Sequence, residues 1–128
     1  MDPEVLLVED EKNIILGVRT CLDAVGYRAH VVEDGEEALK YLKTRRPDLV
    51  LLDLMLPKID GFEVLKKIKE KDSTRDIPVI VLTAKVSRED QERALALGAD
   101  YYMTKPFRPR ELWDKIKHFL PGSEEDPF

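Results

Sequence analysis

The sequence predicts an α/β fold in which a five-stranded parallel sheet lies between two layers of helices. Short, entirely apolar runs at residues 5–8 and 49–52 indicate strands that are buried on both faces. Segments with apolar residues at helical spacing lie between such runs, and glycine or proline marks most boundaries. Because strands alternate with helices along the whole chain, we expect parallel strands joined by right-handed connections.

The composition is that of one domain, which we expect to span residues 1–121 and to be followed by a short acidic tail at 122–128. The chain has 128 residues, of which 43% are hydrophobic, enough for a single core. Its net charge of −5 argues against nucleic-acid binding by this domain through a basic surface. No apolar run is long enough to cross a membrane. One cysteine, Cys21, and no evident signal peptide favour a cytoplasmic location.

The first half of the chain contains three predicted strands and two predicted helices. The second strand is short and partly polar, as expected at the edge of a sheet. Gly26 follows the first helix at a position that favours a left-handed residue, and Asp34 can cap the second helix. The strands are expected at residues 5–8, 27–32 and 49–52, and the helices at 13–25 and 35–44.

The second half continues the same alternation. Pro78 stands near the start of the fourth strand, where proline is tolerated, and Ser87 can cap the fourth helix. The inner face of that helix is expected to consist of Ala94, Leu95 and Leu97. The helices are expected at residues 61–71, 88–97 and 109–120, and the strands at 77–82 and 99–104.

Asp53 directly follows the apolar run at residues 49–52. A charge in such a position is costly, so it requires a partner, a metal or a chemical role. Ligands of open parallel sheets bind beyond the carboxyl ends of the strands. Other strands deliver polar groups to the same edge, namely Glu9, Asp10, Thr83 and Lys105.

This set of residues indicates a metal-assisted phosphoryl-transfer site. Two carboxylates about 4 Å apart repel by roughly 4 kcal/mol at an effective dielectric constant near 20, so cations are expected among them. Mg²⁺ and Lys105 would supply positive charge, and the same charges would allow Asp53 to attack a phosphoryl group. Thr83 could donate a hydrogen bond to a phosphoryl oxygen. A simpler alternative is a buried ion pair between Asp53 and Lys105, with Thr83 as an ordinary strand residue.

The chain resembles the receiver domain of bacterial two-component response regulators over about residues 4–120. The resemblance rests on the segments Val-Glu-Asp-Glu at 8–11, Leu-Asp-Leu-Met-Leu-Pro at 52–57, Asp-Gly at 60–61, Val-Leu-Thr-Ala at 81–84, Gly-Ala-Asp at 98–100 and Lys-Pro-Phe at 105–107. It implies a flavodoxin-like, doubly wound (βα)5 sandwich with strand order 2-1-3-4-5.

The resemblance also implies a phosphoacceptor and a metal site. Asp53 would accept a phosphoryl group from a sensor histidine kinase or a histidine phosphotransfer protein. Glu9, Asp10, Asp53 and the backbone carbonyl of Met55 would hold Mg²⁺. The family often has two aspartates where this chain has Glu9 and Asp10. The protein would catalyse only its own phosphorylation and dephosphorylation, and would not be an enzyme acting on other substrates.

Further roles are implied for residues around the phosphoryl group. Thr83 and Lys105 would bind its oxygens, and Tyr102 would be an aromatic switch that turns inward when Thr83 moves. The bond before Pro106 is expected to be cis. The residues two positions after the phosphoacceptor and the threonine influence water access in this family, so the bulky Met55 implies a long-lived phosphoryl group.

The segment at 88–117 resembles the helix 4–strand 5–helix 5 face through which winged-helix regulators form dimers. Phosphorylation would then switch this face to control a partner or an output domain, with a phosphorylation-dependent homodimer as one outcome. The sequence does not distinguish a stand-alone regulator from the receiver of a longer DNA-binding protein, and solvated surface charge is the simpler explanation for the segment.

Two other classes use related features. Haloacid dehalogenase phosphatases also have a nucleophilic aspartate, but they require a second acid two residues later, where this chain has Met55. Flavodoxin-like electron carriers share the fold, but their first loop cradles a phosphate. The acidic residues 9–11 would repel it.

Overall fold

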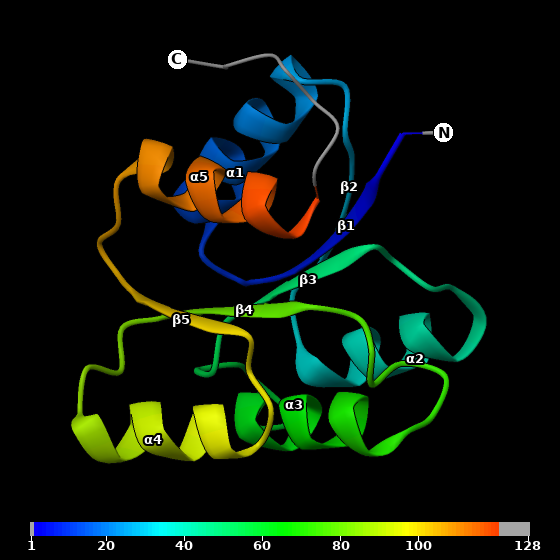
Figure 1. The fold of residues 1–128 in the computed structure, drawn as a ribbon, viewed down its shortest axis with the longest axis vertical. Helices are drawn as coiled ribbons and strands as arrows, with labels where there is room; N and C mark the ends of the chain where they lie inside the picture. The colour runs from blue at the N-terminus through cyan, green and yellow to red at the C-terminus, as the bar shows by residue number, and fades with distance from the viewer. Residues whose placement is uncertain (1, 121–128) are drawn as a thin grey trace.

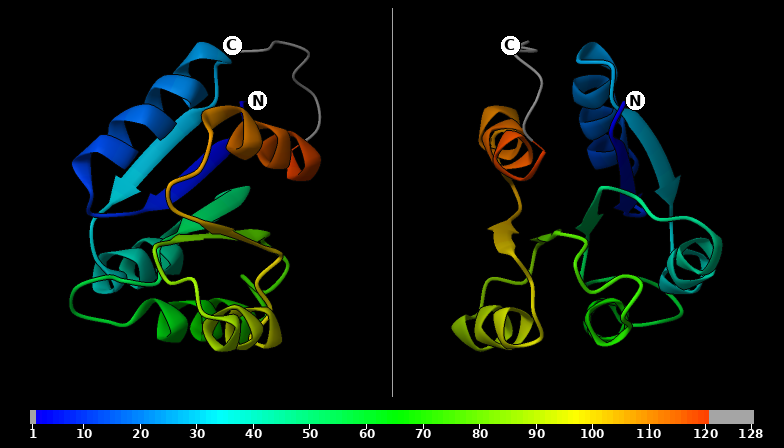
Figure 2. Two further views of the ribbon diagram at one scale, coloured as in Figure 1. Left: turned by 90° about the vertical axis from the view of Figure 1, so that its left-hand side faces the viewer. Right: turned by 45° about the vertical axis from the view of Figure 1, so that its right-hand side comes forward.

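The computed structural model describes residues 2–120, which form a parallel sheet between two helical layers. Helices α1 and α5 cover one face of the sheet, and α2, α3 and α4 cover the other (Figures 1 and 2). The strands are β1 (Glu4–Val8), β2 (Arg28–Val32), β3 (Leu49–Leu52), β4 (Val79–Thr83) and β5 (Tyr101–Thr104). The helices are α1 (Lys12–Ala24), α2 (Gly35–Thr44), α3 (Gly61–Glu70), α4 (Arg88–Ala96) and α5 (Pro109–Phe119).

The sheet has the strand order β2-β1-β3-β4-β5, with all neighbours parallel. This confirms the expected flavodoxin-like topology. The chain passes from β1 outward to β2 and returns to β3 on the other side of β1, so the direction of winding reverses between β1 and β3. In open α/β sheets, ligands bind at this switch point. Asp53 follows β3 there, and its N–H donates to the carbonyl of Val8 at 3.0 Å.

The sheet separates two hydrophobic clusters, which explains why the central strands are mainly apolar. In β1, Leu6 and Val8 pack with α2, α3 and α4, whereas Val5 and Leu7 pack with α1 and α5. Side chains of a strand alternate between its faces, so a strand covered on both sides has no position for an exposed polar residue. The fully buried Trp113 of α5 belongs to the second cluster.

The structure corrects the predicted start of two strands, while the other boundaries agree to within one residue. We predicted strands at 77–82 and 99–104, but β4 begins at Val79 and β5 at Tyr101. Asp100 explains both differences. Its carboxylate accepts a hydrogen bond from Val79 N at 2.8 Å, and its own N–H donates to Val79 O at 2.9 Å. Pro78, which has no N–H, precedes this junction, so the ladder starts only after it.

The expectation that Leu95 faces the core is wrong, because this side chain is 46% exposed. Helix α4 contacts the core through the fully buried Ala94, and Leu97 is partly buried against the same cluster. Consecutive residues of a helix point about 100° apart, so the neighbour of Ala94 turns toward solvent.

Two further expectations concern the ends of the chain and its surroundings. The acidic tail at 122–128 lies outside the described residues, so the division at residue 121 remains a prediction. Among residues 2–120, no helix has the length and apolar character needed to cross a membrane.

Gly61 begins α3 and packs closely against the residues that follow β3. A Cβ atom at this position would lie 2.4 Å from Leu54 Cα and 2.6 Å from the carbonyl oxygen of Asp53. Gly17, in the middle of α1, has nothing within 4 Å of the corresponding position. Of these two glycines, only Gly61 lies where the absence of a side chain permits a close approach of two backbone segments.

We predict opposite effects of alanine at these two positions. Gly61→Ala should lower the free energy of unfolding by about 1–3 kcal/mol through overpacking against the backbone. Gly17→Ala should raise it by about 0.5–1 kcal/mol, because alanine restricts the unfolded chain and favours a helix. Urea titration followed by the fluorescence of Trp113 measures both values. Equal effects of the two substitutions would contradict this account of Gly61.

Candidate functional site

Asp53 lies at the carboxyl end of β3 with its side chain fixed from two sides. The residue is only 5% exposed. Its Oδ1 accepts a hydrogen bond from Met55 N at 3.0 Å, and its Oδ2 lies 3.1 Å from Lys105 Nζ. The carboxylate is therefore oriented by the backbone of its own loop and by a cation from a different strand.

Lys105 directly follows β5 and precedes a cis peptide bond to Pro106, as predicted. Its ammonium nitrogen lies 2.7 Å from Glu9 Oε1, 3.1 Å from Asp53 Oδ2 and 3.5 Å from Glu11 Oε2. Burial by itself would lower the pKa of Lys105, but the carboxylates of Glu9 and Asp53 outweigh burial and raise the pKa. The lysine is thus held in its charged form within a group of acids.

Glu9 is fully buried at the carboxyl end of β1, and its pKa is raised to about 7. Burial is the main cause and the negative charge of Asp53 adds to it, while the ammonium group of Lys105 acts in the opposite direction. Its Oε2 accepts a hydrogen bond from Glu11 N at 3.2 Å. Its buried Oε1 has the ion pair with Lys105 but no hydrogen bond to any of residues 2–120. One ammonium group therefore leaves this pair of carboxylates short of positive charge.

The acidic side chains at this edge have the chemistry of a site for a hard divalent cation. Glu9, Asp10 and Asp53 each offer a carboxylate oxygen, and these oxygens all lie within 4.8 Å of one another. Asp10 is exposed, so the group opens to solvent on one side. Mg²⁺ prefers oxygen ligands and retains several waters, so a partly open carboxylate group suits it. The donor set thus fits the cation that the sequence predicted.

Thr83 and Tyr102 meet at the loop that follows β4. Thr83 is fully buried, and its Oγ1 accepts a hydrogen bond from Lys85 N at 3.3 Å. The hydroxyl of Tyr102 donates to the carbonyl oxygen of Lys85 at 2.7 Å, and the tyrosine is only 8% exposed. Burial raises the pKa of Tyr102, and the charges of Asp90 and Asp53 add to that shift. The tyrosine therefore lies inward, bonded to the loop next to Thr83.

The structure brings the predicted residues together as two adjoining groups. The first contains Glu9, Asp10, Asp53 and Lys105, and the second is the pair formed by Thr83 and Tyr102. Two contributors were not predicted from the sequence, namely the side chain of Glu11 and the backbone of Lys85. The acidic run at residues 9–11 was a signal for Glu11, whereas the role of Lys85 depends on loop geometry alone.

Comparison with known proteins identifies the class. A family model of the response regulator receiver domain matches residues 5–117. The chain belongs to this family, whose members are signalling proteins of two-component phosphorelays. This membership decides against the phosphatase and the electron carrier considered above.

Relatives of known identity refine this placement. The chain is 44% identical over 124 residues to the alkaline phosphatase synthesis transcriptional regulatory protein PhoP of Bacillus subtilis, covering 97% of this chain and 51% of that protein. It is 40% identical over 128 residues to the phosphate regulon transcriptional regulatory protein PhoB of Pseudomonas aeruginosa, covering 97% and 56% respectively. The chain thus spans about half the length of these regulators.

Solved structures agree with the fold. A putative response regulator from Chloroflexus aurantiacus superposes with a TM-score of 0.88 at 30% identity, covering 95% of this chain and all of that one. The receiver domain of a sensor histidine kinase from Pseudomonas aeruginosa superposes with a TM-score of 0.85 at 32% identity, over 95% of this chain and 100% of that one. That structure has a magnesium ion coordinated in the active-site cleft.

We predict that Lys105 stabilises the fold chiefly by offsetting the repulsion between two buried carboxylates. In metal-free buffer above the pKa of Glu9, Lys105→Met should lower the free energy of unfolding by about 3 kcal/mol, because both acids lose their cation. In an Asp53→Asn background the same substitution should cost clearly less. A double-mutant cycle measured by urea unfolding gives the difference. An equal cost in both backgrounds would show that the three charges are not coupled.

Proposed function

We propose that Asp53 is the phosphoacceptor of this receiver domain. The observation that carries the proposal is the position of its carboxylate, which is buried, oriented by Met55 N and placed 3.1 Å from the ammonium group of Lys105. An oxygen of Asp53 attacks phosphorus in a phosphohistidine of a sensor histidine kinase or a histidine phosphotransfer protein. The P–N bond breaks and its electron pair stays on the ring nitrogen, so an imidazole that solvent has protonated on its other nitrogen leaves as the neutral ring and an acyl phosphate remains on Asp53.

The surrounding residues orient the phosphoryl group and offset its charge. Lys105 can move from its carboxylate partners onto a phosphoryl oxygen, and the hydroxyl of Thr83 can donate to another. Glu9, Asp10, Asp53 and the backbone carbonyl of Met55 would hold Mg²⁺. When bound, this ion supplies the positive charge that two or more anionic groups in one site require.

The protein uses this chemistry on itself and does not turn over other substrates. Attack of water on the acyl phosphate would restore the carboxylate of Asp53, so the domain controls how long it stays phosphorylated. Met55 follows the phosphoacceptor by two residues and has 55% of its surface exposed, which leaves its side chain free to cover the phosphoryl group. The lifetime of the acyl phosphate on Asp53 would therefore set the duration of the signal.

Phosphorylation is read out through Thr83 and Tyr102. A shift of the Thr83 hydroxyl toward phosphate would break its bond to Lys85 N, and Tyr102 is bonded to the carbonyl of the same residue. The signal would reach the α4–β5–α5 face, which would control a partner or an output domain, with a phosphorylation-dependent homodimer as one form of control. The relatives PhoP and PhoB are transcriptional regulators, which supports control of an output domain.

The first test removes the proposed nucleophile. Asp53→Asn keeps the size of the side chain but should abolish phosphorylation by a small-molecule donor such as phosphoramidate in magnesium buffer. Asp114→Asn, at an exposed position on α5, should leave the stoichiometry of one phosphoryl group per chain unchanged. Intact-protein mass spectrometry measures both. Full incorporation into the Asp53→Asn variant would end the proposal.

A second test concerns the lifetime of the acyl phosphate. We expect it to persist for minutes or more, because Met55 limits the approach of water. Met55→Ala should shorten the lifetime several-fold, whereas Leu95→Ala, at an exposed site on α4, should not change it. Loss of phosphate from the purified protein gives the rates. Decay of the unsubstituted protein within seconds would contradict the shielding role.

A further inference from the structure

A groove between α2 and α3 has features that the phosphoryl site does not use. It encloses about 730 Å³ and is separate from the acidic cluster, because none of the acidic side chains of the phosphoryl site lines it. Leu39, Ile59 and Ile68 form its apolar floor, and Leu39 and Ile59 are only partly buried. Pockets of 300–1,000 Å³ with an apolar lining are typical of small-molecule sites.

The groove is positively charged although the chain as a whole is negative. Four lysines and two glutamates line it, so its formal charge is +2 on a chain whose net charge is −5. Lys67 lies 3.9 Å from a carboxylate oxygen of Glu63. Lys40, Lys43 and Lys71 form no ion pair with any other residue in the range 2–120. Their charge is therefore available to a ligand.

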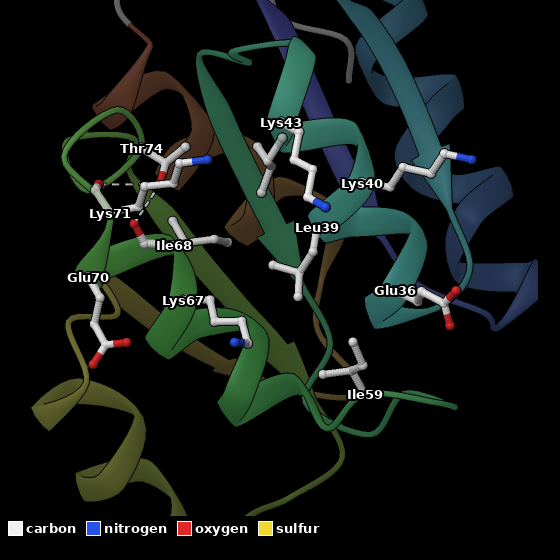
Figure 3. A pocket seen from close by; sticks show the side chains of 11 residues that line it. Glu36, Leu39, Lys40, Lys43, Ile59, Lys67, Ile68, Glu70, Lys71 and Thr74 are labelled. Carbon is white, nitrogen blue, oxygen red and sulfur yellow. Dashed lines mark hydrogen bonds between the residues drawn. The ribbon is translucent and has the colours of Figure 1, made fainter.

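The directions of the charged side chains strengthen this asymmetry. Figure 3 shows the ammonium groups of Lys43 and Lys71 directed toward the space between the two helices. The carboxylates of Glu36 and Glu70 point away from that space in the same view (Figure 3). The ammonium groups thus lie beside the apolar floor of the groove, while the carboxylates point away from it.

Lysines in the last turn of a helix also complement the helix dipole, which accounts for Lys43 and Lys67. The dipole does not account for an open apolar floor beneath them. We propose that this groove binds a small amphipathic anion, with an apolar body on Leu39 and Ile59 and a carboxylate, sulfonate or phosphate group near Lys43 and Lys71.

The arrangement favours a compact ligand over an extended acidic peptide. Glu36 lies in the first turn of α2 and Glu70 is the last residue of α3, so the two acids flank the groove at opposite ends of its walls. Although these carboxylates point away from the groove, their negative charge at both ends would repel an acidic chain that ran along it. A ligand with a single anionic group avoids both.

The test uses anilinonaphthalene sulfonate, which combines an aromatic body with one sulfonate, and its uncharged relative N-phenylnaphthylamine. The sulfonate probe should bind the folded protein at one saturable site. In the double variant Lys43→Gln/Lys71→Gln, its Kd should rise about fivefold through the loss of two exposed charges. The uncharged probe should bind more weakly and should be insensitive to these substitutions. Fluorescence titration gives the constants.

The matched control removes two lysines elsewhere. Lys12→Gln/Lys117→Gln, on α1 and α5, changes the net charge equally but should leave the Kd unchanged. Amide chemical shifts should change in α2 and α3 when the sulfonate probe is added. Equal weakening in both double variants, or shifts centred on the smaller pocket of about 170 Å³ beside Phe107, would overturn the proposal.

Discussion

The rest of the site depends on one interaction, the placement of the Lys105 ammonium group between the carboxylates of Glu9 and Asp53. The carboxylate oxygens of these two buried acids lie within 4.8 Å of each other, so the acids would repel strongly without a cation. One lysine offsets part of that charge, while burial and, to a lesser extent, the charge of Asp53 still raise the pKa of Glu9. The proposed Mg²⁺ ion would supply further positive charge at this position, next to the proposed phosphoacceptor.

The fold holds these three charged side chains close together by placing each of them at the end of a strand. Asp53 and Glu9 extend from adjacent strands, and Lys105 arrives from the edge strand β5. Gly61 allows the start of α3 to pack against the backbone of Asp53 and Leu54, which holds the residues after β3 in place. The loop at Lys85 is bonded to both Thr83 and Tyr102, because Lys85 N donates to the Thr83 hydroxyl and the Tyr102 hydroxyl donates to Lys85 O.

The position of Glu9, Asp53, Thr83 and Lys105 at one edge of the sheet could be predicted from the sequence, because the carboxyl ends of parallel strands meet there. The strand order came from the family resemblance and not from the residues. The starts of β4 and β5 were missed because the side chain of Asp100 replaces a backbone partner there. Contacts that depend on loop paths or helix spacing, such as the Lys85 bonds and the α2–α3 groove, leave no periodic signal in a sequence.

The most direct measurement of the central claim is chemical mapping of the phosphorylated residue. The protein is phosphorylated in magnesium buffer, treated with borohydride, which reduces an aspartyl phosphate to homoserine, and digested for peptide mass spectrometry. We expect homoserine at position 53 and at no other aspartate. Homoserine at a different aspartate, or a phosphoryl group that resists borohydride, would contradict the assignment of Asp53 as the nucleophile.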